Sequence, residues 1–125
     1  MHVNFSQQVL DFAQKHQEPK SRFRHDQDFF YAENECGTAA CLAGIACMLS
    51  SDVEIRNVTV DDEDSGYEGF EPFVNGKQAE WDDEAQRLMG LTPGQANDLF
   101  YTFDNEEAIA LLQEYIEDAE QQAAP

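Results

Sequence analysis

The order of apolar residues predicts a buried helix in the first half of the chain. From Ala39 to Leu49 no residue is charged or strongly polar. A helix that is apolar on all sides is buried in protein, and this stretch is too short to cross a bilayer. We therefore predict a central core helix over residues 38–49. Thr38 is the expected N-cap, because its hydroxyl can accept an unsatisfied backbone N–H of the first turn.

Helical spacing also predicts an amphipathic helix before this segment. Apolar residues recur from Phe5 to His16, which indicates a helix over residues 6–17, with Asn4 or Ser6 as the cap. We interpret residues 20–28 as a polar connector. Residues 32–37 are expected to form an irregular loop that leads into the central helix.

A small β-hairpin is predicted after the central helix. Apolar residues alternate with polar ones from Val53 to Val60, and an acidic turn follows at residues 61–66. Residues 70–74 would supply the returning strand, and Asn75-Gly76 is a strong turn signal. We therefore place a two-stranded insertion over residues 53–75.

The last third of the chain predicts three further helices from their boundary signals. Gly90 is placed as a C-terminal cap after a helix that begins near Trp81. The sequence from Thr92 to Gln95 forms a capping box with proline at the first helical position. Asp104 to Glu107 opens the final helix. The chain is thus expected to be a single domain of residues 1–125, mainly α (α+β), with four to five helices around the central one.

Charge narrows the classes of partner. The 125 residues include 26 acids and seven bases, a formal net charge of −19, and no base follows Arg87. Nucleic acid and anionic membranes would repel such a chain, so we expect neither as a direct partner. A basic protein surface is the natural partner, and the oligomeric state stays open.

The expected location is the cytoplasm. No stretch resembles a transmembrane helix, and the first residues lack the basic-then-apolar order of a signal peptide. The three cysteines are an odd number, which favours reduced thiols over a secreted disulfide framework.

Two cysteines nevertheless suggest a catalytic alternative. Cys36 and Cys41 flank the predicted start of the central helix, where the helix dipole can lower a thiol pKa. The alternative function is a thiol-dependent enzyme or redox protein that uses Cys36 or Cys41. A papain-like nucleophile would also need a histidine, for which His25 is the candidate. Buried free cysteine is the commoner outcome, so the main prediction is a non-catalytic protein.

Metal and nucleic-acid motifs are weak. Cys36, Cys41 and His25 lack the paired spacing of a zinc site. The acidic turn at residues 61–66 resembles the start of a calcium loop, but Pro72 stands where the bidentate Glu belongs. A helix-turn-helix outline over residues 82–100 has no base on its second helix. We therefore predict no metal and no cofactor.

Two blocks of the chain carry a distinctive set of residues. They are Cys36-Gly37-Thr38, Cys41, Ala43-Gly44 and Ala46, and then Gly90-Leu91-Thr92, Gln95-Ala96 and Leu99-Phe100. These blocks resemble a family of small uncharacterised bacterial and phage proteins, whose motif is Cys-Gly-Thr-x-x-Cys-x-Ala-Gly-Trp-Ala, followed later by a Gly-Leu-Thr…Ala…Leu-Phe block. The resemblance covers roughly residues 5–116, and Ile45 replaces the usual tryptophan. It implies a compact helical fold, no known activity, and a regulator or inhibitor of host machinery.

Three functions follow from these features. The first is an acidic interaction protein that docks on a basic surface, such as a phage-type nucleic-acid mimic of the anti-CRISPR or anti-restriction class. The second is the thiol enzyme, and the third is an acidic structural protein whose charge serves solubility or a salty cytoplasm. The residues expected to bind the partner are Asp61, Asp62, Glu63, Asp64, Glu68, Glu71, Glu106, Glu107, Glu114, Glu117 and Asp118.

Overall fold

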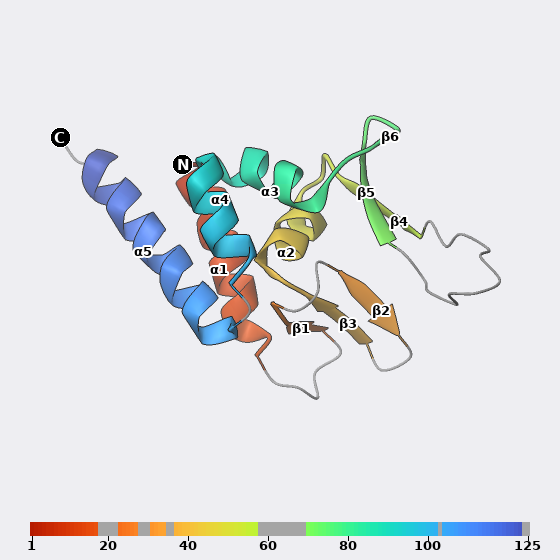
Figure 1. The fold of residues 1–125 in the computed structure, drawn as a ribbon, viewed down its shortest axis with the longest axis horizontal. Helices are drawn as coiled ribbons and strands as arrows, with labels where there is room; N and C mark the ends of the chain where they lie inside the picture. Colours follow the sequence, from red (N-terminus) through yellow and green to blue (C-terminus); the bar gives the residue numbers. More distant parts are fainter. Residues whose placement is uncertain (18–22, 28–30, 35–36, 58–69, 103, 124–125) are drawn as a thin grey trace.

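The structure is a computed structural model that describes residues 1–17, 23–27, 31–34, 37–57, 70–102 and 104–123 (Figure 1). Within these ranges it confirms a mainly helical α+β fold. The helices are α1 (Val3–Lys15), α2 (Leu42–Leu49), α3 (Trp81–Met89), α4 (Pro93–Phe100) and α5 (Asn105–Ala123). The strands are β1 (Phe23–His25), β2 (Ala32–Asn34), β3 (Gly37–Ala40), β4 (Glu54–Asn57), β5 (Phe70–Val74) and β6 (Lys77–Gln78).

The predicted central helix is buried, but it is shorter than expected. Every residue of α2 from Leu42 to Cys47 is buried, and the helix packs against α1 and α3. Its N-cap is Cys41, which makes no side-chain capping bond, so the expected cap at Thr38 is wrong. The helix therefore begins four residues after the predicted start at residue 38.

The segment before α2 is a strand because it hydrogen-bonds on both edges. β3 pairs in parallel with β1 and antiparallel with β2, which gives the sheet order β1-β3-β2. The expected connector at 20–28 and loop at 32–37 therefore contain strands. A short apolar run fits a buried strand as well as a buried helix, so periodicity alone could not separate the two.

The predicted hairpin is present and gains a third strand. β4 pairs antiparallel with β5, and β5 pairs antiparallel with β6. Asn75 and Gly76 both have positive φ, 53° and 79°, as a two-residue type I′ turn requires. Val58, Val60 and the acidic turn at residues 61–66 lie outside the described residues.

The start of α1 also differs from the prediction. The helix begins at Val3 rather than residue 6, and neither Asn4 nor Ser6 caps it. Instead, the backbone N–H of His2 donates to the Met89 carbonyl at 2.8 Å, which ties the beginning of α1 to the end of α3. Gly90 leaves room for this approach, since a Cβ there would lie 2.8 Å from the His2 nitrogen.

The boundary signals in the last third are confirmed. Gly90 ends α3 in the left-handed conformation with φ of 68°. Both hydrogen bonds of the capping box between Thr92 and Gln95 are formed at the start of α4. None of the described helices is long and apolar enough to span a membrane.

Candidate functional site

The last helix has one buried side and one charged side. Ala108, Leu112 and Ile116 are buried, where α5 packs against α1 and α4. In Figure 1 the helix runs along the outer edge of the molecule. The sequence after Arg87 contains no base, so the exposed side carries only negative charge. We call this side the α5 acidic face; it consists of the exposed residues Glu106, Glu107, Glu114, Glu117 and Asp118.

The positions of the first two carboxylates of this face are explained by the local structure of the helix. Glu106 and Glu107 lie in the first turn of α5, where the positive end of the helix dipole favours acids. The backbone N–H of Glu107 donates to Oδ1 of Asp104 at 3.0 Å, which is the expected N-terminal cap. These acids stabilise the helix whether or not they bind a partner.

The remaining carboxylates lie where local interactions oppose them. Glu114 and Asp118 are four positions apart, and Glu114 and Glu117 are three apart, so like charges are neighbours on one helix surface. The last turn contains no base to complement the negative end of the dipole. The amide of Gln113 donates to Glu117 at 3.4 Å, which does not neutralise its charge. This half of the face therefore destabilises α5.

The negative potential extends from α5 to α4. Burial raises the pKa of Tyr115, and the charges of Asp98 and Glu114 raise it further. Asp98 is exposed on α4, so its carboxylate adds to the field around the middle of α5. The candidate interface consequently spans two helices.

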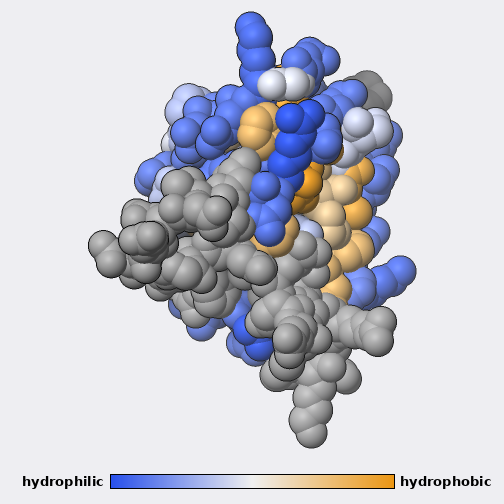
Figure 2. Space-filling model, turned by 90° about the vertical axis from the view of Figure 1, so that its right-hand side faces the viewer, coloured by the Kyte–Doolittle hydropathy of each residue, from blue (hydrophilic) through white to orange (hydrophobic). Residues whose placement is uncertain are grey.

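Glu71, which was also predicted to bind a partner, does not join this face. Glu71 lies half-buried on β5, on the opposite side of the molecule from α5 (Figure 1). Burial raises its pKa, and the charge of Glu80 adds to the shift. Figure 2 shows the side of the molecule that carries the sheets, where apolar residues form a band among hydrophilic ones. Five further predicted residues lie outside the described ranges: Asp61, Asp62, Glu63, Asp64 and Glu68.

The structure places the candidate nucleophile Cys41 in the core. Its side chain is 1 % exposed, and burial raises the thiol pKa to about 11. Backbone N–H groups at the start of α2 lower the pKa, but desolvation has the larger effect. Burial likewise raises the pKa of Cys47 to about 12. Cys36 lies outside the described residues. Neither buried thiol is suited to nucleophilic attack.

His25 is equally unavailable as a general base. It is 1 % exposed, and both ring nitrogens are engaged. Nε2 lies 2.7 Å from Oε1 of Gln27, which can only accept, so Nε2 carries the proton. Nδ1 then accepts from the amide of Gln17 at 2.9 Å. Burial lowers the pKa of His25, which keeps the ring neutral.

Gln27 is a structural centre that sequence reasoning missed. Its Oε1 also accepts the N–H of Leu42 at 2.9 Å, which caps the first turn of α2. Its amide nitrogen donates to the carbonyls of Leu99 and Thr102 at 3.2 and 2.8 Å. One side chain thus joins β1, the start of α2 and the end of α4. A single glutamine in a polar segment gives no sequence signal for this role.

The described residues contain no group of three His, Cys, Asp or Glu side chains that could hold a metal ion. The second helix of the helix-turn-helix outline, α4, carries the exposed residues Asn97 and Asp98 and no base. Phosphate contact requires positive charge, so this hairpin is unsuited to bind nucleic acid.

No known protein family, curated protein or solved structure matches this chain. The resemblance to the Cys-Gly-Thr family therefore stays a prediction. The features that bear on function are those of the chain itself, and the α5 acidic face is the strongest of them.

Proposed function

We propose that this protein is a non-catalytic interaction protein whose α5 acidic face docks on a basic protein surface. The observation that carries the proposal is the position of Glu114, Glu117 and Asp118. These exposed carboxylates repel one another and have no base in their helix. Solubility alone would be served as well by acids at helix N-termini, where they also stabilise the fold. Acids placed against local stability are expected where a surface interaction needs them.

We expect the partner to be a protein that binds nucleic acid, because the surfaces of such proteins present positive charge along an extended track. A helix with carboxylates along one side offers such a track a charged rod. The negative field steers the encounter and speeds association, and occupation of the track excludes the nucleic acid. An inhibitor of a host nuclease or defence complex, of the phage anti-CRISPR or anti-restriction type, would work in this way.

Competition with DNA tests this function. The protein is immobilised, basic partners are captured from a bacterial lysate at low salt, and a captured partner is purified. Duplex DNA is then titrated into the complex. We expect DNA to displace the protein, and we expect the affinity to fall steeply as salt rises. Capture of no nucleic-acid-binding protein would contradict the proposal, as would a captured partner that binds DNA and this protein simultaneously.

A further inference from the structure

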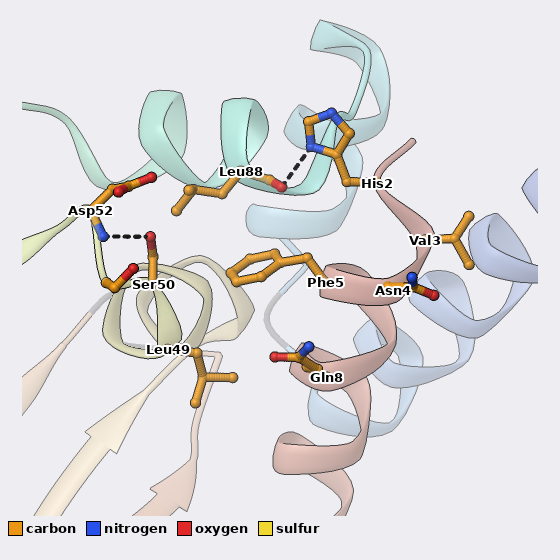
Figure 3. Close-up of a pocket in the computed structure, with 10 residues that line it drawn as sticks. His2, Val3, Asn4, Phe5, Gln8, Leu49, Ser50, Asp52 and Leu88 are labelled. Carbon is orange, nitrogen blue, oxygen red and sulfur yellow. Dashed lines mark hydrogen bonds between the residues drawn. The ribbon is translucent and has the colours of Figure 1, made fainter.

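A groove opens on a different part of the molecule from the α5 acidic face. It lies between the beginning of α1 and the ends of α2 and α3, and its volume is about 570 Å³ (Figure 3). Phe5, Leu49 and Leu88 form its apolar lining, and each is partly exposed. In Figure 3 the Phe5 ring points across the groove toward Ser50. The partly exposed side chain of Phe5 is therefore part of the groove lining.

The polar rim of the groove carries negative charge. Asp52 is exposed, and among the residues that the structure describes its carboxylate has no hydrogen-bond or ion-pair partner. Its backbone N–H donates to the hydroxyl of Ser50 at 3.1 Å, which holds the turn after α2. α2 ends here with no base in its last turn, so its terminal carbonyls add partial negative charge. The end of the groove at Asp52 therefore favours a cation.

An aromatic ring and a carboxylate that line the same groove fit an arginine side chain. Arginine stacks its planar group on aromatic rings and pairs with carboxylates through two parallel N–H groups. The chain itself contains this arrangement at another place. Cζ of Arg56 lies 4.6 Å from the centroid of the Phe73 ring, while its Nη2 lies 2.9 Å from Oε2 of Glu54. The groove supplies the ring and the carboxylate without the arginine.

We propose that this groove binds an arginine side chain of the basic partner, with the guanidinium paired with Asp52 and the rest of the side chain extending toward Phe5. The proposal rests on the proposed function, since the arginine belongs to that partner. The alkyl part of the side chain would lie against Leu49 and Leu88. The α5 acidic face attracts the partner at long range but does not set its orientation. Contact at the groove would fix that orientation.

The test uses blocked tripeptides, acetyl-Ala-X-Ala-amide, with arginine, lysine or the neutral isostere citrulline as X. Each is titrated into the ¹⁵N-labelled full chain at physiological salt, and amide shifts are followed by NMR. The arginine peptide should shift the amides of Phe5, Leu49 and Asp52 saturably, and the citrulline peptide should not. Asp52→Asn should weaken arginine binding about threefold, whereas the matched control Asp118→Asn should leave it unchanged.

Two results would overturn the groove proposal. One is that arginine and lysine peptides shift residues across all acidic surfaces equally; the other is that Asp52→Asn leaves arginine binding unchanged. Both variants replace an exposed side chain, and an unchanged unfolding midpoint verifies their folds. If the groove fails while DNA still displaces the protein from its partner, only the groove proposal is lost. If the groove binds arginine but no basic partner is captured, the proposed function fails instead.

Discussion

Replacement of Asp118 by lysine should stabilise the protein, although most substitutions destabilise. Asp118 is exposed on α5, one helical turn after Glu114. The variant removes a like-charge pair and creates a Glu-to-Lys pair in the favourable orientation at this spacing. Each change contributes a few tenths of a kcal/mol, so the free energy of unfolding should rise by about 0.5 to 1 kcal/mol. For a chain of this size, the melting temperature should rise by about 2 to 5 °C.

Asp83→Lys is the matched control, because it makes the same change of charge elsewhere. Asp83 is exposed in the first turn of α3, where the dipole favours acids, and Arg87 follows four positions later. The control should therefore lose about 0.5 to 1 kcal/mol. A general relief of the net charge of −19 affects both variants alike, so their difference isolates the local placement.

Urea denaturation at low ionic strength, followed by circular dichroism, measures both variants. Urea is uncharged, whereas guanidinium would screen the interactions in question. Added salt should shrink the difference between the variants. Equal stability of the two variants, or a less stable Asp118→Lys, would show that the α5 carboxylates carry no local penalty and would remove the reason to assign them a function.

Three further predictions concern the core. Gln27→Leu should lower the free energy of unfolding by about 3 kcal/mol or more in urea melts, because it leaves several buried groups unpaired; a loss below about 1 kcal/mol would contradict the network. Burial lowers the pKa of His25, so the unfolded chain binds its proton more readily and stability should fall as pH drops below about 6.5. His25→Gln should flatten that dependence, and an unchanged slope would refute the assignment. In a Cys36→Ser background, Cys41 and Cys47 should not react with a thiol reagent at pH 8 until urea unfolds the chain. The reason is that burial raises their pKa values to about 11 and 12. Rapid reaction of the native protein would contradict their burial.

The sequence predicted those parts of the fold that depend on neighbouring residues. The capping box at Thr92, the left-handed cap at Gly90 and the Asn75-Gly76 turn each depend on the conformation of two to four residues. Such signals can be read without knowledge of the rest of the chain. The burial of α2 was also predictable, because composition alone excludes its exposure.

Features that depend on distant residues were not predictable. β3 is a strand because β1 and β2 lie on either side of it, and its own residues fit a helix equally well. The early start of α1 depends on a hydrogen bond from His2 to Met89, far along the chain. The role of Gln27 likewise depends on carbonyls of α4 and its following turn.

The sequence predicted which acidic residues are exposed on α5, but not how the predicted acids are arranged in space. Sequence placed exposed acids on α5, and the structure separates them from Glu71 on β5. The start of α2 does lower the thiol pKa of Cys41, as the argument from the helix dipole predicted. Burial raises this pKa by more, so the thiol is not reactive. The groove beside Phe5 could not be foreseen, because it is formed by the ends of three helices that meet only in the fold.

The affinity of a captured basic partner for two double variants tests the central claim most directly. Glu117→Gln/Asp118→Asn removes two of the five charges of the α5 acidic face, and Glu80→Gln/Asp83→Asn removes the same charge from exposed positions at the start of α3. We predict that the α5 variant binds about tenfold more weakly than the natural chain, while the α3 variant changes little. Equal weakening by both variants would contradict the account, because only the overall charge would then matter.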